Sequence, residues 1–179
     1  MLLKGRVYLS KNQFNEAQNL FQAYLKDNPK FPMGHYLLAM AYFGNRDVQQ
    51  AKASLAEAIK LSPKWQEPKL LLADSYLREG AYDQAIDQAK DILKDNPRST
   101  QAYMVMGNAY MLKKNISGAA KTFDELTKIA PNNPVAYTQQ GRILLIQKKE
   151  KDAMAKFEKA LSLQPNYIEP LQYIISIYM

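Results

Sequence analysis

Residues 100–133, TQAYMVMGNAYMLKKNISGAAKTFDELTKIAPNN, contain the pattern that decides the fold of this chain. Their key residues recur along the whole sequence at a constant spacing of 34 residues. A fixed period of this length is the signature of stacked structural repeats. The residues that keep the spacing are the prolines Pro29, Pro63, Pro97, Pro131 and Pro165, the alanines Ala17, Ala51, Ala85, Ala119 and Ala153, the aromatic residues Tyr8, Tyr42, Tyr76, Tyr110 and Tyr178 with Leu144 in between, and the small residues Gly5, Ala39, Ala73, Gly107 and Gly141.

The order of residue types within this stretch matches a known family. It runs from large residues through a small one to tyrosine, alanine, phenylalanine and a closing proline, at Tyr103, Met106, Gly107, Tyr110, Ala119, Phe123 and Pro131. In this pattern the whole chain resembles the tetratricopeptide repeat. The resemblance implies an all-α, right-handed superhelical solenoid of antiparallel helix pairs, with about five repeats plus a terminal helix. It also implies protein binding, without naming a partner.

The repeat period predicts a single array over residues 1–179. The units are expected at approximately 1–31, 32–65, 66–99, 100–133 and 134–167, with a partial unit at 168–179. Terminal repeats of a solenoid normally carry a polar cap, and neither end of this array has one. We therefore expect either an excerpt of a longer array or ends that are covered by a second copy.

The ends of several helices are marked by residues with known capping chemistry. The sequence Gly-Asn-Arg-Asp at 44–47 separates two periodic apolar stretches and is typical of a helix break. Ser99 is suited to accept a hydrogen bond from an early helical N–H group. Asn133 has the same role, and Pro134 follows it at the first helical position, where a missing N–H group costs nothing.

Composition excludes several classes of protein. With 47% hydrophobic and 23% charged residues, the chain is typical of a folded protein. Its apolar runs are far shorter than the ~20 residues of a membrane helix, so we expect a soluble chain without membrane insertion. The absence of cysteine excludes thiolate catalysis and cysteine-based zinc sites, and it leaves both the cytoplasm and the bacterial periplasm open.

The net charge of +7 raises the question of nucleic-acid binding. The basic residues are spread over nearly every predicted helix and are not clustered. The densest group, Lys148, Lys149 and Lys151, alternates with Glu150 and Asp152, as solvated turns do. This pattern argues against nucleic acid, and binding of acidic polymers stays as an alternative.

The sequence contains no recognisable catalytic, metal or cofactor site. His35 is the only histidine and occupies a packing position of its helix, so His-based nucleophilic and metal sites are excluded. No glycine-rich phosphate loop is present. Asp83, Asp87 and Asp91 share one helix face, but that face is predicted to be convex and wet. We therefore predict a protein that is not an enzyme and has no metal or cofactor.

The helix predicted in the second unit is apolar on two faces. One face would pack internally and carries His35, Leu38, Ala39 and Tyr42. The opposite face carries Met33, Tyr36, Leu37, Met40 and Phe43. In the tetratricopeptide family this opposite face lines the concave surface. A helix that is apolar all round is either buried or binds something.

We therefore predict a concave groove that binds an apolar or amphipathic peptide segment of a protein partner. Its residues would be Met33, Tyr36, Leu37, Met40, Phe43, Leu70, Asp74, Leu77, Met104, Asn108, Met111, Gln139 and Arg142. About half of the apolar side chains on this face, Leu71, Val105 and Phe43 in particular, are expected to lie buried between adjacent helices. Chaperone-binding members of the family hold a C-terminal carboxylate with lysine and arginine side chains, and the matching positions here supply no cation.

Two alternatives and one context remain open at this stage. The first alternative is self-association through the terminal helices, with Ile174, Ile175 and Tyr178 in the contact. The second is a basic surface that binds acidic polymers. The style of the repeats resembles that of large bacterial arrays in envelope assembly, secretion and polysaccharide export, and we expect the scaffold to act in such an assembly.

Overall fold

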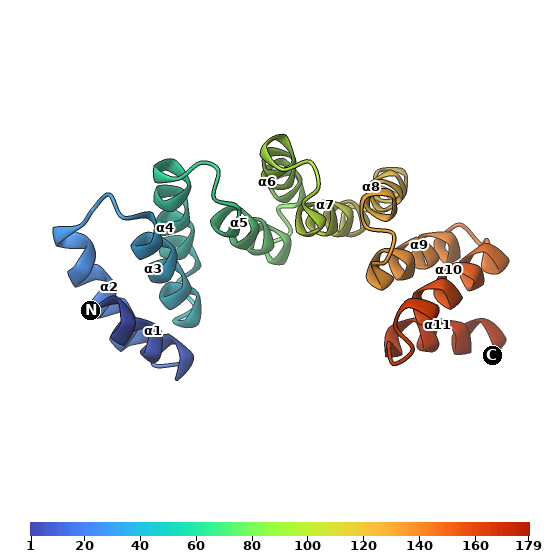
Figure 1. The fold of residues 1–179 in the computed structure, drawn as a ribbon, viewed down its shortest axis with the longest axis horizontal. Coiled ribbons are helices and arrows are strands. Elements are labelled where there is room, and N and C mark those ends of the chain that lie inside the picture. Colours follow the sequence, from blue (N-terminus) through green and yellow to red (C-terminus); the bar gives the residue numbers. More distant parts are fainter. The chain divides into compact units, whose positions relative to one another are not determined.

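The computed structural model describes all residues, 1–179, and confirms the all-α prediction: it contains eleven α-helices and no strand (Figure 1). The helices are α1 (Leu2–Ser10), α2 (Phe14–Asp27), α3 (Pro32–Gly44), α4 (Val48–Leu61), α5 (Gln66–Arg78), α6 (Tyr82–Asp95), α7 (Thr100–Leu112), α8 (Ile116–Ile129), α9 (Pro134–Ile146), α10 (Glu150–Leu163) and α11 (Ile168–Tyr178).

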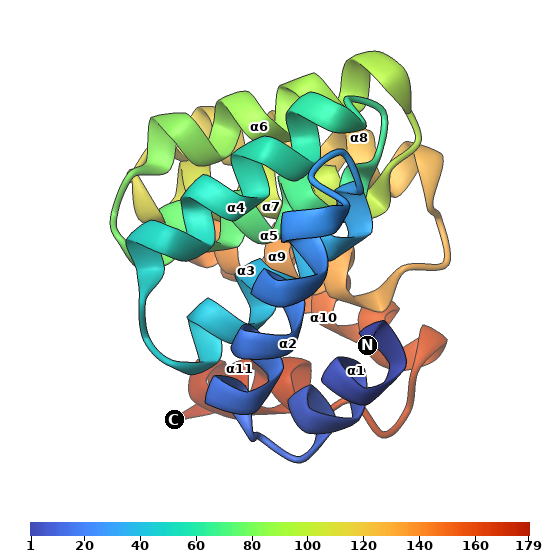
Figure 2. The same ribbon diagram turned by 90° about the vertical axis from the view of Figure 1, so that its left-hand side faces the viewer.

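The chain forms two compact units. Unit 1 comprises residues 1–79 and holds α1 to α5, and unit 2 comprises residues 80–179 and holds α6 to α11. Within each unit, helices joined by a short turn pack side by side as antiparallel pairs, such as α9 with α10 in unit 2 (Figure 1) and α1 with α2 in unit 1 (Figure 2). The single continuous array and the right-handed superhelix stay predictions.

The two helices of a pair are held close by a glycine that faces a phenylalanine. The pairs are Gly5 with Phe21, Gly107 with Phe123, and Gly141 with Phe157. A Cβ atom added to any of these glycines would overlap the ring of its partner, and all three rings are fully buried. The small residues that recur every 34 positions therefore have a steric cause, because a small residue on the first helix leaves room for a large side chain of the second.

The pair of α3 and α4, and the helix α6, carry other residue sizes at these positions. In the second pair, Ala39 replaces the glycine and contacts the smaller Leu55, which is also fully buried. In α6 the second-helix position holds Ala89, and Ile92 lies fully buried one helical turn further along. The core thus keeps its volume although individual residues change, as close-packed interiors require.

The predicted helix ends are confirmed. Asp47 caps α4 by accepting a hydrogen bond from the N–H group of Gln50 (3.2 Å), and Ser99 caps α7 in the same way. The side chain of Asn133 caps α9, with Pro134 at its first turn. Between α3 and α4, the residue with left-handed backbone geometry is Arg46, with a φ of 62°, and not the neighbouring glycine. Its equivalents at the 34-residue spacing, Asn12, Gly80, Lys114 and Lys148, all have positive φ as well.

Polar contacts tie consecutive pairs together at another repeated position. Asn45 donates to Gln18 (2.7 Å), and Glu79, 34 residues later, accepts from Lys52 (2.7 Å). The side-chain hydrogen bond from Lys52 lowers the pKa of Glu79 below its usual value. In unit 2 the equivalent Lys113 pairs with an aspartate of α6, Asp83, so the sign of the charge is reversed.

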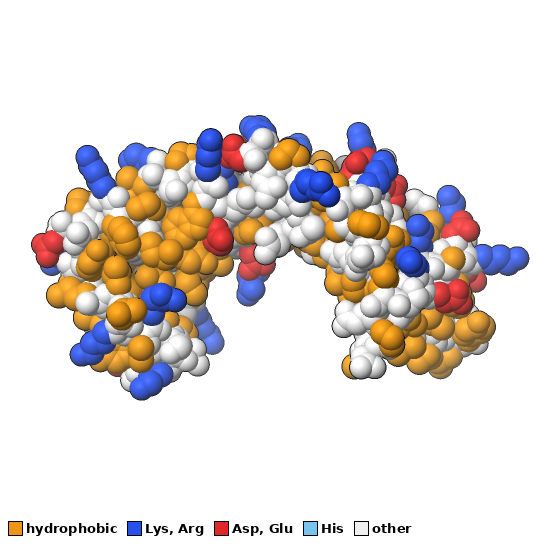
Figure 3. All heavy atoms as spheres, viewed as in Figure 1, with side chains coloured by type: hydrophobic (Ala, Val, Ile, Leu, Met, Phe, Trp, Pro, Cys, Tyr) orange, Lys and Arg blue, Asp and Glu red, His pale blue; other side chains and the backbone are white.

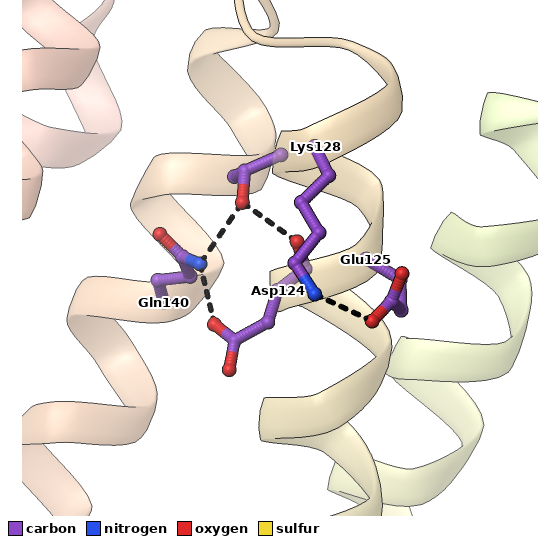
Figure 4. Close-up of polar contacts among 5 residues, drawn as sticks. Asp124, Glu125, Lys128 and Gln140 are labelled. Atoms are coloured by element: carbon purple, nitrogen blue, oxygen red, sulfur yellow. Dashed lines mark hydrogen bonds and ion pairs between the residues drawn. The ribbon is translucent and has the colours of Figure 1, made fainter.

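In unit 2, α8 and α9 share a further polar contact (Figure 4). The side-chain amide of Gln140, which is buried, donates to Asp124 (2.7 Å) and to the hydroxyl of Thr127 (3.3 Å). Beside this contact, Lys128 pairs with Glu125 (2.8 Å) within α8, and this hydrogen bond raises the pKa of Lys128. Side-chain hydrogen bonds therefore add to apolar packing between repeats.

We expect Gly107→Ala to lower the free energy of unfolding by about 1–2 kcal/mol, although alanine is the better helix former, because the new methyl group overlaps the buried ring of Phe123. Adding Phe123→Leu should recover much of the loss, since Ala39 and Leu55 already form such a pair. Urea unfolding of both single variants and the double variant measures this coupling. Gln101→Ala, at an exposed position of α7, is the control. If the losses of unfolding free energy in Gly107→Ala and Phe123→Leu simply add up in the double variant, the steric explanation is contradicted.

Lys52→Met should raise the pKa of Glu79 toward its ordinary value, because the hydrogen bond that lowers it is lost. Since the folded pKa is the lower one, this contact stabilises the native state above the ordinary pKa of about 4.3 and is lost as the pH falls through the folded value. A carboxyl-carbon NMR titration of Glu79 measures the shift. Lys60→Met, which removes the exposed pair with Glu57, should leave Glu79 unchanged.

Candidate functional site

Unit 1 contains two hollows that share Tyr36 and Met40 in their lining. The first has a volume of about 600 Å³ and is lined by Arg6, Leu9, Ser10, Met33, Tyr36, Leu37, Met40, Trp65 and Glu67. The second has a volume of about 560 Å³ and is lined by Tyr36, Met40, Phe43, Arg46, Val48, Leu71, Asp74, Ser75, Arg78 and Glu79. Figure 3 shows that hydrophobic side chains gather over the helices of this unit. We refer to these cavities as the first and second hollow.

The hollows exist because α3 has two apolar faces. Leu38 and Tyr42 belong to the buried core with α2 and α4. On the other face, Met33 and Met40 remain 42% and 38% exposed, and Tyr36 is half-buried between them. Residues three and four apart in a helix lie on one face, so these three side chains form one surface. We call Met33, Tyr36 and Met40 the α3 surface.

Trp65 completes the first hollow from the start of α5. Its ring centroid lies 5.0 Å from that of Tyr36, with the planes tilted by 57°. Sequence reasoning missed this residue because it occupies the cap position before the helix and not the helix face. A signal was present: Phe31 and Tyr167 stand at the same position in other repeats, where a polar capping residue is usual.

The two hollows differ in the state of their carboxylates, while Arg46 of the second hollow forms no ion pair, like Arg6 of the first. In the second hollow, Asp74 pairs with Arg78 (2.8 Å), and Glu79 accepts from Lys52. In the first hollow, Arg6 and Glu67 are exposed and form no ion pair or side-chain hydrogen bond. Burial is the main cause that raises the pKa of Tyr36, and the negative charge of Glu67 adds to it.

Most predicted groove residues of unit 1 lie around these hollows. Met33, Tyr36, Met40, Phe43 and Asp74 all contribute to a lining. Leu37 also borders the first hollow, but it is only 6% exposed and packs in the core, so it offers little surface to a partner. The half-buried Leu70 and Leu77 border neither hollow.

The predicted residues of unit 2 are tied to their own chain. Met104 and Met111 pack against the core of α7 to α9, and Asn108 is half-buried. Gln139 is not the open groove residue that we expected: it is 6% exposed and accepts a hydrogen bond from Arg142 (2.7 Å). Arg142 in turn lies 4.0 Å from Glu169, so its charge is partly balanced.

Three of the four residues considered for catalysis, His35, Asp83 and Asp91, have structural contacts. His35 donates from Nε2 to the backbone carbonyl of Pro29 (2.8 Å), which fixes the connection between α2 and α3. Asp83 and Asp91 pair with lysines, and Asp87 is exposed. The structure contains no group of three histidine, cysteine, aspartate or glutamate side chains that could hold a metal ion.

The residues proposed for self-association lie on α11. Ile175 and Tyr178 are 57% and 79% exposed, whereas Ile174 is half-buried. The neighbouring Ile168 and Leu171 are exposed as well. No helix has the combination of length and apolar character that crossing a membrane requires.

Comparison with known proteins agrees with the repeat analysis. Tetratricopeptide repeat models match residues 2–64, 70–134 and 134–167. No curated protein sequence matches the chain. Among solved structures, the chain is similar to MamA from Desulfovibrio magneticus RS-1, with a TM-score of 0.78 and 17% identity over 90% of this chain and 91% of that one.

Two further solved structures show the same fold. YrrB, described as a tetratricopeptide repeat protein with an unusual peptide-binding site, has a TM-score of 0.75 and 16% identity over 96% of this chain and 89% of that one. TTC0263, a protein from Thermus thermophilus, has a TM-score of 0.70 and 20% identity over 99% of this chain and 97% of that one. With repeat models covering most of its residues and a helical solenoid fold shared with these structures, the chain belongs to the tetratricopeptide repeat family.

Proposed function

We propose that the chain is a scaffold for protein partners and that unit 1 binds an apolar or amphipathic peptide segment over the α3 surface. The observation that carries this proposal is the position of Tyr36 and Met40, which border both hollows while part of their surface stays open. A segment lying there would cover both side chains and gain apolar burial from each. No covalent chemistry is involved.

The size and composition of the hollows support a peptide. Volumes of about 600 and 560 Å³ fall in the range of pockets that enclose a drug-sized ligand, and each could take several side chains of a peptide. Methionine suits such a surface because its unbranched, polarizable side chain adapts to different shapes. Two hollows that both border α3, with apolar side chains of α3 in their linings, fit the groove recognition of amphipathic helices.

The charges around the hollows favour a peptide over an acidic polymer. Each hollow has both signs in its lining: Arg6 with Glu67 in the first, and Arg46 and Arg78 with Asp74 and Glu79 in the second. Binding of a polyanion requires a surface that is basic throughout. The carboxylates beside the α3 surface would repel successive phosphate or carboxylate groups.

Trp65 provides a direct measurement, because it is the only tryptophan of the chain and lies beside Tyr36. Short peptides with leucine or phenylalanine at positions i, i+3, i+4 and i+7 should change its emission spectrum on binding. Scrambled peptides of equal composition, whose apolar residues do not share one face, should bind more weakly. If no apolar peptide changes the emission of Trp65 at any concentration, the proposed site is wrong.

Met40→Lys should weaken the binding of these peptides about tenfold or more, because it places a charge at the centre of the apolar surface and leaves it desolvated in the complex. Titration of a labelled peptide by fluorescence anisotropy measures the loss. Leu112→Lys is a matched control: it replaces an exposed apolar helix residue, 52% exposed, by the same side chain in unit 2. Equal losses of peptide affinity in Met40→Lys and Leu112→Lys would contradict a binding site at the α3 surface.

Self-association is a second candidate, favoured by the exposed apolar side chains of α11, among them Leu171, Ile175 and Tyr178. Contacts of this kind would make the average mass rise with protein concentration. Sedimentation equilibrium measures the mass, and Ile175→Lys should remove the dependence on concentration. A mass that stays constant in the unmodified chain excludes this candidate.

A further inference from the structure

We propose that the segment bound in the first hollow has an apolar centre flanked by one acidic and one basic residue, with the acidic residue beside Arg6 and the basic residue beside Glu67. This inference rests on the proposed function and specifies the partner of the same site. It identifies a chemical class of peptide: an amphipathic segment with one charge of each sign next to its apolar anchors.

The two charged residues come from different helices on either side of α3. Arg6 belongs to α1, which packs against α3, and Glu67 belongs to the first turn of α5. Between them lies the α3 surface, with Leu9 of α1 and Trp65 at the start of α5 completing the apolar lining. A bound segment that covers this lining therefore meets both a positive and a negative side chain at the border of the hollow.

Neither charge is used within the protein. Arg6 and Glu67 have no ion-pair partner and no side-chain hydrogen bond, whereas Asp74 and Glu79 of the second hollow are both paired. Glu67 lies close enough to Tyr36 for its negative charge to add to the raised pKa of that phenol, after burial, which is the larger cause. An exposed, unpaired charge beside an apolar hollow is placed to contact a bound group of opposite sign.

Charge complementarity selects the flanks of the peptide. A peptide with two acidic flanks gains attraction at Arg6 and meets repulsion at Glu67, and a peptide with two basic flanks has the reverse problem. Only a mixed pair of flanks is attracted at both ends. The direction in which the peptide lies is not fixed, so the mixed peptide is tested with its two charges in both orders.

The experiment uses three peptides with one shared apolar centre and flanks of Glu and Lys, Glu and Glu, or Lys and Lys. Their affinities for the full chain are measured by fluorescence anisotropy at low salt, and the emission of Trp65 reports whether they occupy the first hollow. The mixed peptide should bind about threefold or more tightly than the other two. The preference should shrink as salt is raised, because exposed charges are screened.

Variants at Arg6 and Glu67 should change which of the three peptides binds most tightly, in the direction that the new charge dictates. Arg6→Glu should make the Lys and Lys peptide the best ligand, and Glu67→Lys should favour the Glu and Glu peptide. The double variant should again prefer the mixed peptide. Lys151→Glu and Glu158→Lys are matched controls, since they make the same changes of net charge at exposed positions of α10 and should leave the preference unchanged.

The outcomes separate this inference from the proposed function. If peptides bind and change the emission of Trp65 with equal affinity whatever their flanks, the charge inference is wrong and the apolar site stands. If no peptide binds, both are wrong. If the chain instead forms dimers whose strength depends on Arg6 and Glu67, measured by sedimentation, the occupant is a second copy of this chain and the peptide assignment is overturned.

Discussion

The contact between a glycine of the first helix and a phenylalanine of the second is the constraint on which the rest of each repeat depends. It sets how closely the two helices approach, because the ring lies directly against the helix backbone. In the three pairs that have this contact, the ring is fully buried. Where alanine replaces glycine, as at Ala39, the facing residue is a leucine, so the sum of the two sizes matters more than either residue alone.

In α3 this internal packing uses one face of the helix and leaves part of the opposite face exposed. In α3 the free face carries Met33, Tyr36 and Met40 beside two hollows, and in unit 2 the corresponding residues are largely engaged by their own chain. The repeats are therefore similar in their interiors and different on their open faces. The proposed site on α3 therefore requires no change to the packing that supports it.

The sequence predicted the helices, their caps and the apolar face of α3, because these depend on residues within one or two turns of each other. It did not predict Trp65 or Arg6 as part of the site, since they reach the first hollow from neighbouring helices and only the packing of α1 and α5 against α3 brings them there. Gln139 was misjudged for the same reason: its burial depends on a contact with Arg142 that spacing alone does not show. The helix and face on which a residue lies could be predicted from the sequence, but its exposure to solvent could not, because exposure depends on contacts with distant residues.

The polar contacts between consecutive pairs have a consequence for the order of the modules. Lys52 meets Glu79 in unit 1, but Asp83 meets Lys113 in unit 2, so the same location carries opposite polarity in different repeats. If the modules were shuffled or exchanged with those of another molecule, Lys52 would face Lys113, or Asp83 would face Glu79, and like charges would repel. The charge pattern therefore matches each of these pairs to its own neighbour better than to the other, by the modest amount that exposed ion pairs contribute.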